Sequence, residues 1–214
     1  MNLYIVRHGE SEGNRSKKIQ GTMDFPLTDL GHEQAGAVAS FCQELDIEYV
    51  YSSDLKRAST TAEAIAKEFG QRVHRWEALR EVHLGPMQGL TREEIAEKFP
   101  ETKEKPLITS GLPGTETNEA LTERSHSVLR QLKKAHAHDN VAIVSHGGFI
   151  SCLLMYILVG ENWASYERPF MIGNTSVTHL EWRKREDRYL LHYTNRTAHL
   201  DSIRTEINVK HGLL

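Results

Sequence analysis

The segment Val141-Ala142-Ile143-Val144-Ser145-His146-Gly147-Gly148 decides the fold of this chain. Its first five residues are apolar on both faces, which is typical of a strand buried in the middle of a parallel sheet. The strand ends at a histidine that a glycine-bearing turn follows. In open α/β sheets this is the place where side chains meet a ligand. The segment therefore predicts an α/β fold and a functional group at His146.

A second histidine stands in the same setting near the start of the chain. The short apolar run over residues 3–6 ends at Arg7-His8-Gly9-Glu10, and Arg57 follows a further predicted strand over residues 46–51. Because the carboxyl ends of parallel strands share one edge of a sheet, we expect Arg7, His8, Arg57 and His146 to face one crevice. Two imidazoles and two guanidiniums without a nearby carboxylate cluster suit a phosphate dianion.

The remaining hydrophobic periodicity alternates strands with helices. It predicts a three-layer α/β/α sandwich with a mostly parallel central sheet and an antiparallel edge strand, all in one domain over residues 1–214. Two long loops are expected over residues 9–28 and 100–116. Further strands are predicted over residues 73–76, 176–182 and 189–194, and helices over residues 31–45, 55–69, 91–99, 118–137 and 149–159.

Composition narrows the class of protein. The 26 basic and 29 acidic residues give a net charge of -3, which argues against a nucleic-acid-binding surface. We see neither a signal peptide at the start nor a run of about 18 apolar residues, so we expect a cytoplasmic protein without a membrane partner. Cys42 and Cys152 lie in apolar helical patterns, and we expect buried free thiols rather than a disulfide.

Several blocks of sequence resemble a known family, and they occur in the same order as in that family. They are residues 7–10, Asn14, residues 21–28, residues 52–58, residues 79–81 and residues 145–147. The chain is similar to the histidine phosphatase superfamily, in its phosphoglycerate mutase-like branch. A single Arg-His-Gly would be weak evidence, whereas ordered blocks spread over most of the chain are specific.

The resemblance implies a role for each catalytic position. His8 would be the nucleophile that forms a phosphohistidine. Arg7, Arg57 and His146 would stabilise the transferring phosphoryl group. Glu81 would protonate the departing alcohol oxygen and then take a proton from the attacking water.

The same resemblance suggests substrate-binding residues, which are Asn14, Gln20, Gly21, Thr22 and Gly147. Asn14 would add a neutral donor, while Gln20 and Thr22 lie where the family's loop passes over the substrate or merely form a polar turn. No metal and no cofactor is expected, because a zinc site at His8 and His146 lacks a third ligand with local spacing.

The resulting hypothesis is a phosphatase that hydrolyses small-molecule phosphomonoesters. The alternatives are a phosphoglycerate mutase and a non-catalytic protein that binds a phosphorylated ligand. The interval between Glu81 and His146 leaves little room for the lid-forming insertion of phosphoglycerate mutases, which favours hydrolysis in a site open to water. The physiological substrate does not follow from the sequence, and the oligomeric state stays open, with a homodimer as one option.

Overall fold

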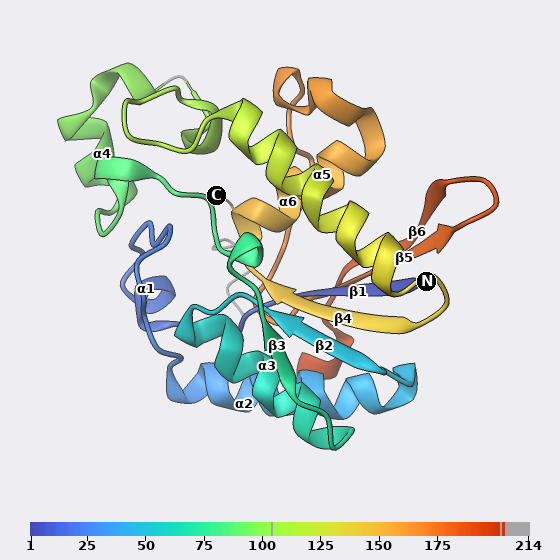
Figure 1. Ribbon diagram of the computed structural model, residues 1–214. Helices are drawn as coiled ribbons and strands as arrows, with labels where there is room; N and C mark the ends of the chain where they lie inside the picture. Colours follow the sequence, from blue (N-terminus) through green and yellow to red (C-terminus); the bar gives the residue numbers. More distant parts are fainter. Residues whose placement is uncertain (104, 202, 204–214) are drawn as a thin grey trace.

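A six-stranded sheet forms the centre of the computed structural model, which describes residues 1–103, 105–201 and 203 (Figure 1). The strand order is β3-β2-β4-β1-β5-β6. The strands β3, β2, β4 and β1 are parallel to one another, whereas β5 is antiparallel to both β1 and β6. The strands are β1 (Asn2–Arg7), β2 (Tyr49–Ser52), β3 (Val73–Arg75), β4 (Asn140–Ser145), β5 (Val177–Arg183) and β6 (Arg188–Arg196).

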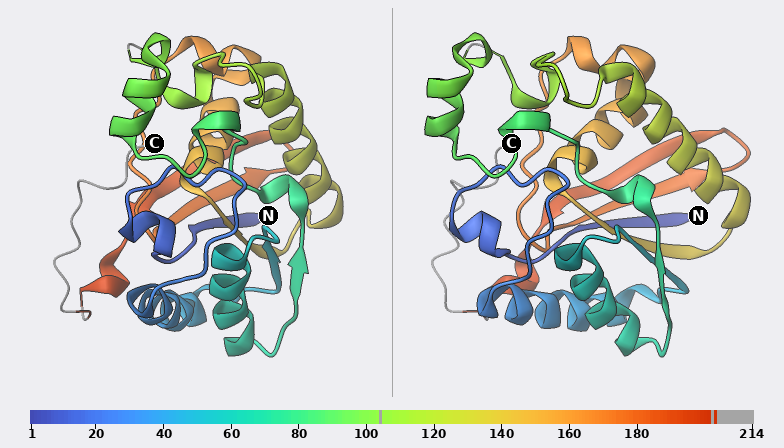
Figure 2. Two further views of the ribbon diagram at one scale, coloured as in Figure 1. Left: turned by 90° about the vertical axis from the view of Figure 1, so that its left-hand side faces the viewer. Right: turned by 60° about the vertical axis from the view of Figure 1, so that its left-hand side comes forward.

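Helices cover both faces of this sheet, with α2 and α3 on one side and α5 and α6 on the other (Figure 1). The segments that contain α1 and α4 lie beyond the carboxyl ends of the parallel strands (Figure 2). The helices are α1 (Glu12–Arg15), α2 (Asp29–Cys42), α3 (Lys56–Glu68), α4 (Arg92–Lys98), α5 (Asn118–Ala135) and α6 (Gly147–Val159).

The central strands supply two hydrophobic cores. Leu3 and Ile5 of β1 point into the core beneath α5 and α6, whereas Tyr4 and Val6 point into the core beneath α2 and α3. The strand β4 alternates in the same way, because successive side chains of a strand face opposite sides of the sheet. The predicted three-layer fold is confirmed, and its antiparallel edge contains two strands.

Two expected loops contain more regular structure than predicted. In the first, α1 forms because Ser11 and Asn14 make a reciprocal capping box, in which asparagine takes the place of the usual Glu or Gln. In the second, short 3-10 helices occupy Pro100–Thr102 and Leu107–Thr109. The 3-10 helix Gln43–Leu45 falls within the helix expected over residues 31–45. The other 3-10 helices, which the sequence did not predict, are Glu77–Leu79, Gly85–Met87, Gly160–Ser165 and Ala198–Leu200.

Helix α6 begins two residues earlier than expected, at Gly147, and its middle is the most hydrophobic part of the chain. Together with the following 3-10 turn it forms a segment, Gly147–Ser165, that is long and apolar enough to cross a membrane by composition alone. Its residues 148–155 are buried against the sheet, so packing in the core accounts for this hydropathy. Gly160, Glu161 and Asn162 interrupt the segment, so the sequence contains no unbroken run of about 18 apolar residues here.

Both cysteines are buried free thiols, as expected. Burial raises the pKa of each thiol to about 12. The end of the predicted domain, residues 204–214, lies outside the described residues.

Candidate active site

The register of β1 and β4 brings the two histidines together. Arg7 pairs with Ser145 in the parallel ladder, so His8 and His146 leave the sheet side by side. Their ring centroids lie 5.1 Å apart with an interplanar angle of 58°. Both side chains are buried, with exposed fractions of 2% and 0%. The predicted meeting of the two imidazoles is therefore found in the structure.

The ring of His8 is held by the backbone next to it. Its Nδ1 lies 2.7 Å from the carbonyl oxygen of Gly9. A carbonyl oxygen can only accept a hydrogen bond, so Nδ1 carries the proton. In the neutral ring Nε2 then keeps its lone pair. The backbone of His8 is fixed as well, because its N–H donates to Ser145 O and its carbonyl accepts from Asn174 Nδ2.

The ring of His146 has the opposite tautomer. Arg57 Nε donates to its Nδ1 at 3.2 Å, and a guanidinium can only donate. The proton of the neutral ring therefore sits on Nε2. This Nε2 is buried and has no hydrogen-bond partner among the described residues. A buried donor without a partner is unusual in a folded protein and marks a place where a ligand atom fits.

Both imidazoles are neutral at neutral pH. Burial, followed by the nearby cations Arg57 and Arg7, lowers the pKa of His8 well below 6.5. Burial is also the main cause that lowers the pKa of His146, with Arg57 next. One ring thus presents a lone pair and the other presents an N–H.

The two arginines are deeply buried and remain cations. Arg57, at the start of α3, donates from Nη1 to Met23 O and from Nη2 to Gly21 O at 2.7 and 2.8 Å. Burial lowers its pKa to about 10, which still leaves it charged. Arg7 donates from Nη1 to Ile172 O at 2.6 Å, while its buried Nε has no partner among the described residues. Burial lowers the pKa of Arg7 as well.

Glu81 lies at the N-terminus of α6, next to His146. Its Oε1 accepts from the N–H groups of Val82 and Phe149, and its Oε2 accepts from that of Gly148. The first turn of a helix favours a negative charge, so this position suits a carboxylate. A Cβ on Gly148 would stand 2.6 Å from Oε1, so only glycine leaves room for Glu81 there.

Three of the five predicted binding residues are tied to the catalytic centre. The carbonyl of Gly21 accepts from Arg57, and Gly147 lies against the Arg7 guanidinium, with 3.5 Å between Nε and an ideal Cβ position. Asn14 Oδ1 accepts from Ser11 and, at 3.4 Å, from Asn174, the residue that also holds the His8 carbonyl. Within the part of the chain that the structure describes, the side-chain hydrogen bonds of Asn14 all use Oδ1, which leaves its amide N–H₂ group for a ligand.

The other two predicted residues form the frame of the loop. Gln20 Oε1 accepts from Ser11 Oγ at 2.8 Å. The backbone N–H of Thr22 donates to Gln88 Oε1, and its hydroxyl lies 2.9 Å from His83 Nδ1. Neither side chain contacts His8 or His146, so substrate contact by Gln20 and Thr22 stays a prediction.

Sequence reasoning missed Asn174 and Arg124. Asn174 precedes β5, and the first residues of this antiparallel strand lie at the same edge of the sheet as the last residues of β1. The pair Gly173-Asn174, directly before the predicted edge strand over residues 176–182, was the sequence signal that could have indicated Asn174. Arg124 gave no signal, because it stands among other charged residues within α5.

The combined geometry, in an α/β sandwich, suits the binding and transfer of a phosphoryl group. A lone pair on His8 Nε2, a free N–H on His146, two buried guanidiniums and one carboxylate surround the same strand ends. Among the described residues, no group of three His, Cys, Asp or Glu side chains is placed to hold a metal ion.

Comparison with known proteins assigns the family. Residues 3–195 match the model of the Histidine phosphatase superfamily (branch 1). A relative from Escherichia fergusonii, called "Probable phosphoglycerate mutase GpmB", is 31% identical over 94% of this chain and 96% of its own length. The chain belongs to the histidine phosphatase superfamily.

Solved structures agree with this assignment. A mycobacterial glucosyl-3-phosphoglycerate phosphatase is 28% identical, with a TM-score of 0.80 over 92% of this chain and 99% of that one. A phosphoserine phosphatase from Entamoeba histolytica, solved with 3-phosphoglyceric acid, is 29% identical. Its TM-score is 0.76, over 93% of this chain and 98% of that one.

Proposed function

We propose that this protein is a phosphatase that hydrolyses small-molecule phosphomonoesters through a phosphohistidine on Nε2 of His8. The observation that carries the proposal is the pair of opposite tautomers in one buried site. Gly9 leaves the lone pair of His8 on Nε2, and Arg57 leaves the proton of His146 on Nε2. A nucleophile and a donor for the transferring group are thus set in place before substrate binds.

In the first step, Nε2 of His8 attacks phosphorus and the bond from phosphorus to the ester oxygen breaks. The developing charge on the phosphoryl oxygens is stabilised by Nε2–H of His146 and the guanidinium groups of Arg7 and Arg57. A proton on Glu81 passes to the departing alcohol oxygen. Oε2 is the better placed oxygen for that proton, because it accepts one backbone N–H whereas Oε1 accepts two.

In the second step, water attacks the phosphohistidine. Glu81 takes a proton from that water, the bond between phosphorus and Nε2 breaks, and inorganic phosphate leaves. His8 returns to the neutral ring with its proton on Nδ1, where Gly9 O still accepts it. Protons balance over the cycle, since Glu81 gives one and receives one.

The phosphoenzyme tests this mechanism. We expect p-nitrophenyl phosphate to be hydrolysed and a rapid acid-free quench to trap a phosphorylated protein that loses its label in acid. His8→Ala removes the acceptor and abolishes both the label and turnover, while a chelator leaves both unchanged. A label that persists in His8→Ala, or a folded wild-type protein without phosphate release between about pH 5 and 8, contradicts the proposal.

The alternative reaction is the mutase reaction, which the name of the Escherichia fergusonii relative favours. Chain length does not separate the two reactions, because that relative is matched over 96% of its length. Substrates for the test are 3-phosphoglycerate and phosphoserine, since both comparison phosphatases are named after phosphate esters of three-carbon acids. Isomerisation of 3-phosphoglycerate faster than phosphate release would assign the mutase reaction instead.

A further inference from the structure

A partly buried ion pair between Arg124 and Glu116 holds the segment that carries Glu81. Arg124 of α5 binds Glu116 with two parallel hydrogen bonds, Nε to Oε1 and Nη2 to Oε2, both at 2.8 Å. Its third nitrogen, Nη1, donates to the carbonyls of Ala78 and Arg80 at 3.2 and 2.6 Å. Arg124 therefore fixes the backbone immediately before Glu81.

Glu116 binds the backbone that follows Glu81. Its Oε2 accepts from the N–H of His83, and its own N–H donates to the carbonyl of His83 at 2.8 Å. The ion pair thus contacts the backbone at positions 78, 80 and 83. The side chains of Arg124 and Glu116 are 16% and 17% exposed, and their mutual hydrogen bonds are strengthened by the opposite charges.

Arg124 also touches the helix that receives the carboxylate. Its Cζ lies 4.1 Å from the centre of the Phe149 ring, and the N–H of Phe149 donates to Glu81 Oε1 at 2.8 Å. A guanidinium over an aromatic face is an attractive contact. One side chain therefore contacts both the backbone that precedes Glu81 and the helix turn that binds the Glu81 carboxylate.

We propose that Arg124 is a positioning residue that sets the carboxyl group of Glu81 for proton transfer to the leaving alcohol. This inference rests on the acid role of Glu81 in the proposed function. Arg124 acts through the backbone, and its four hydrogen bonds and ring contact need a planar fork. Lysine has three donors on a single nitrogen and cannot reproduce that arrangement.

The test compares two leaving groups. A p-nitrophenolate leaves without a proton, whereas the alkoxide of glycerol phosphate needs the acid, so only the alkyl ester reports on the position of Glu81. The parameter is kcat/KM, because it reports the steps up to transfer to His8. Glu81→Gln provides the reference, with a loss for the alkyl ester of about 100-fold or more.

We expect Arg124→Met to lower kcat/KM for glycerol phosphate by about tenfold or more and to change kcat/KM for p-nitrophenyl phosphate less than about threefold. For Arg124→Lys, which keeps the charge, we expect a kcat/KM for glycerol phosphate between those of Arg124→Met and wild type. This variant keeps the test usable if Arg124→Met does not fold. In the double variant with Glu81→Gln, loss of Arg124 adds little for the alkyl ester, because the two residues act through one step.

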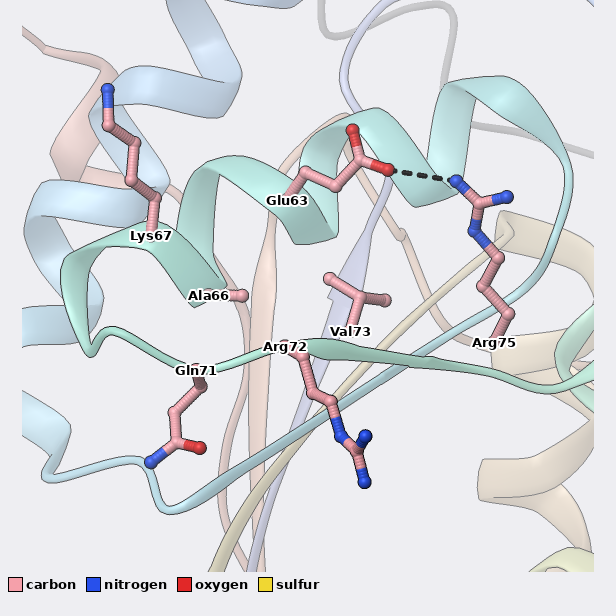
Figure 3. A pocket seen from close by; sticks show the side chains of 7 residues that line it. All are labelled: Glu63, Ala66, Lys67, Gln71, Arg72, Val73 and Arg75. Carbon is pink, nitrogen blue, oxygen red and sulfur yellow. Dashed lines mark hydrogen bonds and ion pairs between the residues drawn. The ribbon is translucent and has the colours of Figure 1, made fainter.

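Arg75→Met is the matched control. Arg75 forms a 3.0 Å ion pair with Glu63 between β3 and α3 (Figure 3), and among the described residues no hydrogen bond or ion pair joins either side chain to residues 78–83. We expect this variant to leave kcat/KM unchanged for both substrates.

The positioning role is overturned if Arg124→Met and Arg124→Lys lower kcat/KM equally for both substrates, or if the folded variants show no loss of kcat/KM. In either case the proposed function stands as long as Glu81→Gln lowers kcat/KM selectively for the alkyl ester. If Glu81→Gln itself shows no dependence on the leaving group, the acid role falls and the positioning role falls with it.

Discussion

His8 and His146 show how neighbours give one residue type two roles. Each follows a buried strand and precedes a glycine, so the sequence presents them as equivalent. A backbone carbonyl fixes the proton of one ring on Nδ1, and an arginine fixes the proton of the other on Nε2. The difference between nucleophile and donor therefore resides in hydrogen-bond partners that lie one residue away in one case and 89 residues away in the other.

The tautomers can be observed directly. In long-range ¹H–¹⁵N spectra of the wild-type protein at pH 7, we expect His8 to be the Nδ1–H form and His146 the Nε2–H form. Because burial and the nearby arginines lower both pKa values well below 6.5, both rings stay neutral at pH 7. His8→Gln and His146→Gln assign the signals. The same tautomer in both rings, or protonation of either ring above pH 6.5, contradicts this assignment.

The same pKa directions link stability to pH. Between the lowered native pKa and the unfolded value of 6.5, the unfolded chain binds more protons than the native protein. The stability that neutral burial provides is therefore complete above pH 6.5 and declines as the pH falls below it.

At the scale of elements, the N-terminus of α6 organises the site. His146 precedes the helix, and the first helical residue lies against Arg7. The N–H groups of the next two residues donate to the carboxylate of Glu81. Unpaired N–H groups at a helix start commonly bind an anion, and here they bind the carboxylate of the protein itself. Strand β4 and helix α6 thus place three functional groups within one turn.

Two glycines in helices test this arrangement. Gly148→Ala places a Cβ 2.6 Å from Glu81 Oε1, so we expect it to destabilise the protein by about 1–3 kcal/mol and to lower kcat/KM for alkyl phosphates. Gly36→Ala in α2 is the control, because no heavy atom lies within 4 Å of its Cβ position. It should stabilise the protein by about 0.5–1 kcal/mol without altering activity.

Urea unfolding and steady-state kinetics measure both variants. A Gly148→Ala protein with wild-type stability and wild-type kcat/KM shows that Glu81 does not need its place at the helix N-terminus.

At the scale of the whole molecule, two cores on opposite faces of one sheet hold the strand ends in register. Helix α6 belongs to one of these cores, and Leu153 there is 0% exposed, whereas Leu158 on the same helix is 55% exposed. We expect Leu153→Ala to lower the free energy of unfolding by about 2–5 kcal/mol and Leu158→Ala to change it by less than about 0.5 kcal/mol.

Urea denaturation of the two variants distinguishes a core helix from a segment that is apolar for another reason. Equal and small effects would contradict the packing of α6 described above.

The sequence by itself determined the layers of the fold and the residues at the strand ends. Apolar residues on both faces of residues 141–145 require burial between helices, and the parallel order brings Arg7, His8, Arg57 and His146 to one edge. Local periodicity carries this information, which is why the main helices and strands were predicted within a few residues. It missed α1, whose cap uses asparagine, and the short 3-10 turns, which have too few residues for a period.

Only the tertiary structure decided how these residues act. The tautomer of His146, the binding of Glu81 by the N–H groups of α6 and the hydrogen bonds of Arg124 to the Glu81 segment all depend on atoms that are far apart in the chain. Hydrophobic periodicity records which face of an element is buried. It does not record which donor meets which acceptor, because that is fixed only when the elements pack.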